Sequence, residues 1–385
     1  MDYALATRPK TPAIRMAGAF TFGIEEEYFL VDAETKSLVR KMPQTFLEAA
    51  NAAAAGRISP EFLQPQIEVI SSPHDNMADA RAELRDLRRT ISAVAGEHGL
   101  AILAAGTHPT GTWRKARQTE KERYDNVMHD LQMIGQRDLV CGLHVHVELP
   151  DPDDRIDLMC RMLPYLPLFL ALSTSSPFWQ SRPTGLKSYR LAAYDELPRT
   201  GVPELFRTRE EFDAYVAALV RAGVIEDSSY IWWAIRPSLL NPTLELRAPD
   251  SCTLIEDSIA IAALYRTLAR HLYLNRWRNS DLTPVGRAII VENKWQAQRH
   301  GVHAIFAAED EAMTVAEMLE RVICDTAADA DALGCSAEVN RCRTIVSSGT
   351  SADAQLALFT AHRRSGSLGA ALRAVTDWIA AATLH

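Results

Sequence analysis

Four segments of the chain alternate apolar residues with acidic, histidine or arginine residues, and this two-residue period narrows the choice of fold more than any other pattern. The segments are residues 21–31, 66–71, 139–149 and 243–247. Side chains on a β-strand point alternately to the two faces of a sheet. The pattern therefore predicts strands that pack a core on one face and gather polar side chains on the other.

The first of these strands carries three consecutive glutamates. Alternation places Glu25 and Glu27 on one face, and Glu26 on the other face between Ile24 and Tyr28. Carboxylates two residues apart lie roughly 7 Å from each other on a strand, and they repel when half-buried. A divalent cation such as Mg²⁺, which prefers oxygen ligands, would relieve that repulsion. A solvated acidic edge strand is the alternative interpretation of this motif taken alone.

The segment at 142–148 alternates in the same way. It directs three apolar side chains to a core face and turns His144, His146 and Glu148 together to the opposite face. Two imidazoles at positions i and i+2 can share a metal ion or a phosphate. A pair of hydrogen-bonded histidines on a sheet face is the alternative.

The remaining two strands add acids and a guanidinium. Glu68 lies between two apolar residues, with Glu61 seven residues upstream, while Glu245 and Arg247 share one face of their strand. Arginine binds phosphate or carboxylate through its planar fork, although a surface salt bridge also fits this pair. The chain contains neither GxxxxGK[ST] nor GxGxxG. A bound nucleotide would therefore be held by metals and basic side chains.

Between these strands the sequence favours helices. Apolar residues spaced by three and four predict an amphipathic helix over 76–98. Potential capping boxes predict three further helix starts, at Thr208 with Glu211, Thr253 with Glu256, and Thr314 with Glu317. Because strands are not separated by one helix each, we expect an α+β fold with a largely antiparallel sheet. We expect an N-terminal arm over 1–19 and a single domain over 20–385.

Composition excludes several classes of protein. The formal net charge of −8 and the pI of about 5.8 disfavour binding to nucleic acid or to an anionic membrane. No uninterrupted apolar run is long enough to span a bilayer, and residues 1–16 lack the apolar region of a secretory signal. We therefore expect a cytoplasmic protein, in which the six cysteines are reduced thiols.

The motifs that carry these residues occur in an order that resembles a known family, the carboxylate–amine ligase branch of the type 2 glutamate–cysteine ligases. The resemblance runs from about residue 22 to about residue 303. It rests on GIEEEYFLVD at 23–32, EFLQPQIEV at 61–69, GTHP at 106–109, CGLHVHV at 141–147, SYR at 188–190, PRTG at 198–201, ELRAPD at 245–250 and ENKWQAQRHG at 292–301. That family is related to glutamine synthetase, which is similar in its E-x-E, G-x-H-x-H and E-x-R-x-P-D strands.

The resemblance implies a fold, a reaction and a set of site residues. The fold would be a curved sheet forming a funnel wrapped by helices, and the reaction an ATP-dependent joining of glutamate to an amine such as cysteine through an acyl phosphate. Mg²⁺, with Mn²⁺ as an alternative, would be bound by Glu25, Glu27, Glu68, His144 and Glu245. His146, Arg190, Lys294 and Arg247 would contact the nucleotide or the reacting groups, Arg247 and Arg190 being catalytic. The resemblance also implies a homodimer acting on small molecules.

Glu148 departs from the family pattern, in which a small or neutral residue is expected. It could cap the strand, add a ligand or alter the amine pocket. A separate alternative is a zinc hydrolase built on His144, His146 and Glu148. A nucleotide-binding protein without turnover is the other alternative. The hydrolase would leave Glu25, Glu27, Glu68 and Glu245 without a role.

Overall fold

The computed structural model describes residues 20–308 and 311–385, so the expected arm over 1–19 lies outside the described residues. Its centre is a seven-stranded antiparallel sheet in the order β2-β3-β1-β5-β9-β8, with β4 also paired to β1. The predicted antiparallel α+β fold is therefore confirmed. The strands are β1 (Phe22–Asp32), β2 (Ile58–Pro60), β3 (Gln66–Ile70), β4 (Leu100–Leu103), β5 (Leu143–Glu148), β8 (Ile235–Pro237) and β9 (Thr243–Leu246).

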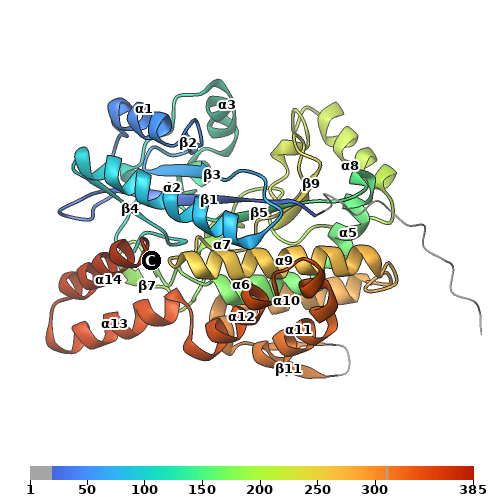
Figure 1. Ribbon diagram of the computed structural model, residues 1–385. Coiled ribbons are helices and arrows are strands. Elements are labelled where there is room, and N and C mark those ends of the chain that lie inside the picture. Colours follow the sequence, from blue (N-terminus) through green and yellow to red (C-terminus); the bar gives the residue numbers. More distant parts are fainter. Residues whose placement is uncertain (1–19, 309–310) are drawn as a thin grey trace, which may run out of the picture.

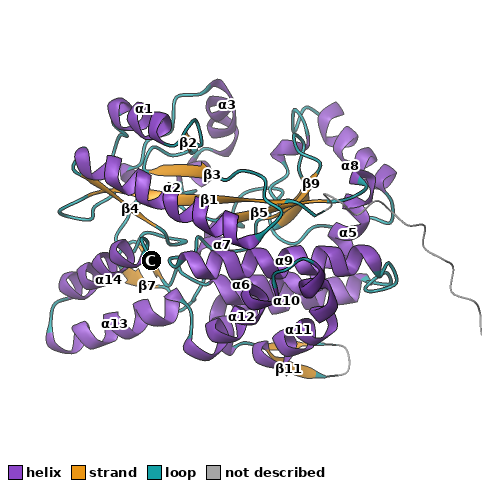
Figure 2. Ribbon diagram, in the orientation of Figure 1, coloured by secondary structure: helices purple, strands orange, loops and turns teal. Residues whose placement is uncertain are grey.

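Helices cover the sheet from several sides (Figures 1 and 2). The predicted helix over 76–98 is α2 (Met77–Glu97), whose first turn is capped by the side chain of Asn76. With α1 (Gln44–Ala53) it buries a small core against β1, β3 and β4. The almost wholly buried α9 (Ile255–Leu274) contacts β5, α2, α6 and α12 and lies at the centre of the larger core.

The remaining helices and two short hairpins lie around α9 and the sheet. The helices are α3 (Glu122–Leu131), α4 (Met133–Gln136), α5 (Arg155–Met162), α6 (Leu166–Ser173), α7 (Arg190–Tyr194), α8 (Arg209–Arg221), α10 (Pro284–His300), α11 (Val315–Ala332), α12 (Ser336–Ser348), α13 (Ser351–Ser365) and α14 (Leu368–Ala382). Two short hairpins pair β6 (Phe178–Trp179) with β7 (Arg182–Pro183) and β10 (Ile305–Ala307) with β11 (Ala312–Thr314).

Strand β1 follows the predicted alternation. Glu26 is fully buried on the helix-covered face, where both of its carboxylate oxygens accept hydrogen bonds from Arg88 of α2, at 2.6 and 2.9 Å. Ser258 of α9 donates a third bond at 2.5 Å. Glu25 and Glu27 point to the opposite face, into a cleft. The two-residue period thus separates one paired glutamate from two that face a cavity.

Of the three predicted helix starts, two are confirmed and one is wrong. Thr208 caps α8, and Thr314 forms a complete capping box with Glu317 at α11. The prediction for Thr253 was wrong, because α9 begins two residues later and its N-cap is Leu254. The Thr253 hydroxyl is buried and donates instead to the carbonyl of Ala104. A long-range hydrogen bond has replaced the local cap.

One stretch, Pro152–Ser173, is long and apolar enough by composition to cross a membrane, with a mean hydropathy of 1.4. In the structure it is not a single α-helix: α5 and α6 are joined by a short 3₁₀ turn. Of its most apolar window, 83% is buried inside the protein. The stretch therefore belongs to the core packed around α9.

Candidate active site

Strand register brings the polar residues together. Across neighbouring strands Glu27 pairs with Glu68, Glu25 pairs with His144, and His146 pairs with Glu245. Directly opposed side chains on one face of an antiparallel pair have Cβ atoms roughly 5 Å apart. Four neighbouring strands, β3, β1, β5 and β9, therefore contribute acids and imidazoles to one surface.

These side chains offer three overlapping sets of ligand atoms, each set lying within 4.8 Å. The sets are Glu25 with His146 and Glu245, Glu25 with Glu68 and His144, and Glu27 with Glu61 and Glu68. They include all five residues expected to bind metal. Glu61, which lies in the loop between β2 and β3, also belongs to the cluster. We call the surrounding pocket the acidic cleft, lined among others by Glu25, Glu27, Glu61, Glu68, His144 and Glu245.

The chemistry of the cluster fits divalent cations. His144 is buried, and neither ring nitrogen has a hydrogen-bond partner among the described residues. Its Nδ1 lies 3.5 Å from Glu25 Oε2, and its Nε2 lies 3.7 Å from Glu27 Oε1. Two ligands of one Mg²⁺, each about 2.1 Å from the ion, lie roughly 3 Å apart in octahedral geometry. Small movements of these side chains would complete such a site.

The acids nearest β3 repel one another. Burial and the Glu61 carboxylate raise the pKa of Glu27 to about 8. Burial, with Glu25 and Glu61 nearby, raises the pKa of Glu68 well above its usual value. Burial also raises the pKa of Glu61. Protonation is thus how the protein tolerates this part of the cluster without a cation.

The acids nearest β9 lie beside cations. Burial alone would raise the pKa of Glu245, but Arg247 and Arg236 outweigh it and hold that pKa well below the usual value. Burial likewise opposes ionisation of Glu25, yet the neighbouring imidazoles of His144 and His146 lower its pKa. One side of the cleft therefore carries permanent negative charge beside fixed cations.

Two arginines hold Glu245. Arg247 forms an ion pair with it and also donates to the Tyr194 hydroxyl at 3.2 Å. Arg236, opposite Glu245 on β8, donates from Nε to Glu245 at 2.7 Å. Arg236 was not among the sequence candidates, because no acid adjoins it in the chain. The cross-strand register alone reveals it.

Arg190 enters the site from the first turn of α7. The side chain is buried, and its Nη1 donates to the carbonyls of Arg247 and Pro249, both at 3.1 Å. Its Nε has no partner among the described residues. A Cβ atom at position 142 would collide with this guanidinium. Gly142 is therefore needed for Arg190 to occupy this position.

Three other sequence candidates have different surroundings. Lys294 lies in α10, where it pairs with Asp195, and it does not line the acidic cleft. Glu148 accepts a hydrogen bond from Thr21 at 2.6 Å, and it belongs to none of the three ligand sets. His146 contacts Glu25 Oε1 at 3.2 Å and Thr243 Oγ1 at 2.8 Å. The trio needed for the hydrolase rival does not converge.

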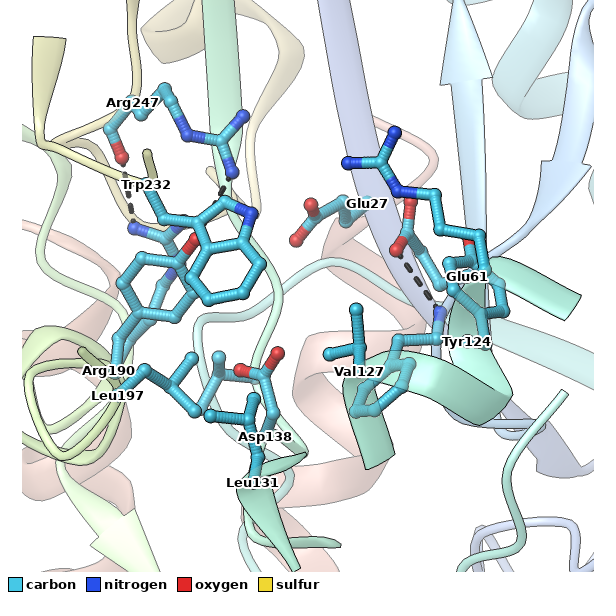
Figure 3. A pocket seen from close by; sticks show the side chains of 14 residues that line it. Glu27, Glu61, Tyr124, Val127, Leu131, Asp138, Arg190, Leu197, Trp232 and Arg247 are labelled. Carbon is cyan, nitrogen blue, oxygen red and sulfur yellow. Dashed lines mark hydrogen bonds between the residues drawn. The ribbon is translucent and has the colours of Figure 1, made fainter. Parts of the chain in front are cut away.

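A second pocket adjoins the acidic cleft. The cleft encloses about 1250 Å³, including its open mouth, and the second pocket about 710 Å³. Glu27, Glu61 and Arg247 line both cavities. We call the second cavity the side pocket; its own walls include Val127, Leu131, Asp138, Arg190, Tyr194 and Leu197 (Figure 3).

Comparison with known proteins agrees with this geometry. The model of the glutamate–cysteine ligase family 2 matches residues 21–374. A protein of Bradyrhizobium sp. (strain ORS 278), provisionally named glutamate–cysteine ligase 2, is 56% identical over 95% of this chain and 88% of its own length. One from Rhodospirillum rubrum with the same name is 44% identical, over 95% of this chain and 96% of its own.

Solved structures show the same fold at low sequence identity. A glutamate–cysteine ligase from Francisella tularensis, in complex with AMP, superposes with a TM-score of 0.67 at 13% identity, covering 94% of this chain and 89% of that one. A bifunctional glutathione synthetase from Pasteurella multocida gives a TM-score of 0.71 at 15% identity, covering 94% of this chain and 52% of that one.

Sequence, strand register and fold thus lead to one assignment. The match to the family model spans nearly the whole chain, including every strand that builds the acidic cleft. The chain belongs to the glutamate–cysteine ligase family 2 and is a C–N bond-forming ligase.

Proposed function

We propose that this ligase uses ATP to join the side-chain carboxylate of glutamate to an amine such as cysteine, through an acyl phosphate. The observation that supports the proposal most is the convergence of five glutamates and one imidazole beside Arg247 in one cleft. A carboxylate is a poor electrophile at neutral pH, and phosphorylation activates it. Phosphoryl transfer requires mainly positioning and electrostatic stabilisation, which this cluster is built to provide.

Divalent ions fit the acidic cleft because its ligands are mostly oxygens and its acids repel one another. Mg²⁺ is the proposed ion, with Mn²⁺ as an alternative. Bound ions would offset the charge that develops on the transferred phosphoryl group. The proposed ligands are Glu25, Glu27, Glu61, Glu68, His144 and Glu245.

The arginines supply fixed positive charge from the protein. Arg247 is held by Glu245 and Tyr194 at the boundary of the two cavities. We assign it to the transferring phosphoryl group, because a preorganised guanidinium stabilises charge without reorganising. The buried Arg190 is assigned to the phosphate or to a substrate carboxylate. His146 is assigned to the nucleotide phosphates. We omit Lys294 from the site because Asp195 holds it outside the cleft.

The proposal also covers the domain organisation, the location and the oligomeric state of the protein. Residues 20–385 would act as one catalytic domain, in a cytoplasmic homodimer that binds small molecules. Glu148 is given no catalytic role, because it bonds to Thr21 beside a different cavity.

The test is a coupled ADP-release assay with Mg²⁺, ATP and glutamate, across a panel of amines. The expected result is ADP release that requires both glutamate and an amine. Hydroxylamine should trap the acyl phosphate as a hydroxamate. Nucleotide binding without ADP formation would instead favour a protein without turnover. Tight stoichiometric zinc with hydrolysis in the absence of ATP would favour the hydrolase.

A further inference from the structure

The side pocket contains a carboxylate that the phosphoryl-transfer scheme does not use. Asp138 lies between α4 and β5, just before the strand that carries the two site histidines. Figure 3 shows its carboxylate turned into the pocket, with Glu27 and Arg247 on the far side. It was absent from the sequence candidates because it precedes the alternating segment and belongs to no motif.

This carboxylate lacks a partner. Asp138 is half-buried, but its Oδ1 is inaccessible to solvent and has no hydrogen-bond partner among the described residues. The buried Asp250 provides a contrast, since it accepts bonds from Ser175 N, Ser176 Oγ and Ser188 Oγ at 2.7 to 3.0 Å. Buried polar atoms in proteins are nearly always paired, so an exception calls for an explanation such as a ligand.

The surroundings of Asp138 suit a small cationic group. Val127, Leu131 and Leu197 form apolar walls beside it, which limit the access of solvent to the carboxylate. A carboxylate that is partly withdrawn from water binds an ammonium group through charge-assisted hydrogen bonds. Arg247 and Arg190, which are assigned above to the transferred phosphoryl group and to the phosphate or a substrate carboxylate, also line this pocket.

We propose that Asp138 binds the ammonium group of the amine substrate and accepts the proton that this group must lose. The side pocket would then select compact α-amino acids with small apolar or thiol side chains, which its walls can cover. This inference rests on the proposed ligase function and names a residue for its second step.

Amide formation requires the ammonium nitrogen to lose two protons. The ammonium group gives one proton to the Asp138 carboxylate and becomes a neutral amine. The nitrogen lone pair attacks the acyl carbon and forms the C–N bond, and the C–O bond to phosphate breaks with its electron pair leaving on phosphate. The nitrogen then loses its second proton to the departing phosphate. Asp138 returns its own proton to solvent after the amide has left.

Its electrostatics agree with this role. Burial and the Glu61 carboxylate raise the pKa of Asp138 to about 7, against the opposing effect of Arg190 and Arg247. A base is most effective when its pKa lies near the working pH. Ions bound in the acidic cleft would neutralise Glu61, leaving burial as the main cause of the raised pKa. The titratable groups that line the pocket with Asp138 are Glu27, Glu61, Arg123, Tyr124, Arg190, Tyr194 and Arg247.

The experiment compares two kinds of nucleophile, three amino acids and hydroxylamine, in wild type and in Asp138→Asn. L-Cysteine, glycine and L-alanine are cationic at neutral pH, whereas hydroxylamine is uncharged and needs no ammonium ligand. We expect kcat/KM for the best of the three amino acids to fall roughly 100-fold in the variant, the scale of a lost general base. Hydroxamate formation and the KM for glutamate should stay within about twofold. Asp130→Asn, the same change at an exposed position of α3, is the matched control.

The outcomes separate the two proposals. A wild-type protein that forms no hydroxamate would overturn the ligase mechanism itself. If hydroxamate forms in wild type but falls equally with the amino acids in Asp138→Asn, or if the KM for glutamate rises, Asp138 does not serve the amine. Hydroxamate formation with none of the three amino acids accepted would refute the α-amino-acid pocket. A rate with the amino acid that declines below about pH 7 in wild type but not in the variant would support it.

Discussion

The two faces of β1 treat the same residue type in opposite ways. On the helix-covered face, Glu26 is neutralised inside the protein by Arg88 and receives a hydrogen bond from Ser258. On the cleft face, Glu25 and Glu27 lie beside other acids and beside His144, whose ring nitrogens have no hydrogen-bond partner among the described residues. Of the three consecutive glutamates, Glu26 therefore stabilises the fold, while Glu25 and Glu27 are available to bind a cation. Burial alone does not distinguish them; the identity of their partners does.

The largest effect should come from the cleft face. Glu27→Gln keeps an oxygen that can accept the hydrogen bond from the Gly142 amide, so the fold should persist. We expect amine-dependent ADP release to fall by about 10⁴-fold, or roughly 5.5 kcal/mol, since the change weakens the binding of charge-compensating ions. Steady-state assays with circular dichroism as the folding check would measure this. Turnover within tenfold of wild type would count against the metal assignment.

On the helix-covered face of β1, a substitution should lower the stability of the fold. Glu26→Gln leaves the fully buried Arg88 without its counter-charge, and breaking a buried pair in this way costs about 3–5 kcal/mol. The loss should appear in urea unfolding at any Mg²⁺ concentration. Arg81→Gln on the same helix, which removes partly exposed ion pairs to Glu256 and Glu338, is the control and should cost about 1 kcal/mol or less. Equal losses of stability in the two variants would show that the buried Glu26–Arg88 pair contributes no more to stability than a partly exposed ion pair.

Arg247 should affect rate more than binding. Arg247→Ala removes the guanidinium proposed to stabilise the transferred phosphoryl group, and we expect kcat to fall roughly 100-fold, or about 2.7 kcal/mol. The affinity for ATP should change less, because the proposed metal ligands remain. Single-turnover kinetics and nucleotide titration together would show the split. Normal single-turnover rates would remove Arg247 from the reaction.

The smallest effect concerns pH. In the metal-free protein Glu68 keeps its proton to a higher pH than in the unfolded chain, where a glutamate titrates near 4.5. The folded state then holds more protons than the unfolded state, so stability should decrease as the pH rises above about 4.5. Glu68→Gln should flatten this decrease and raise the stability near pH 8 by about 1 kcal/mol.

Thermal melts from pH 5 to pH 8, with and without Mg²⁺, would measure this. Because cations compete with protons for the carboxylates, Mg²⁺ should stabilise wild type more at pH 8 than at pH 5. The Mg²⁺ effect should shrink in Glu68→Gln. A Mg²⁺ effect that does not depend on pH, or that is unchanged in the variant, would contradict a cluster whose protons are displaced by ions.

The sequence predicted those features that depend on local periodicity. Alternation alone put Glu25 and Glu27 opposite Glu26, and the same rule predicted the faces of β5 and β9. Features set by pairing between distant segments could not be predicted in this way. Arg236 reaches Glu245 only through strand register, and Lys294 is turned away by Asp195. Asp138 is a candidate because its Oδ1 has no hydrogen-bond partner among the described residues, and no local sequence pattern reveals such an absence.

The central claim is that the cleft face of the sheet holds divalent ions against the terminal phosphate of a nucleotide. Mn²⁺ binding, followed by electron paramagnetic resonance with a non-hydrolysable ATP analogue, tests it most directly. We expect Mn²⁺ binding that is strengthened by the nucleotide and is lost in Glu27→Gln and Glu68→Gln. Mn²⁺ binding that ignores the nucleotide, or that is the same in both variants as in wild type, would contradict it.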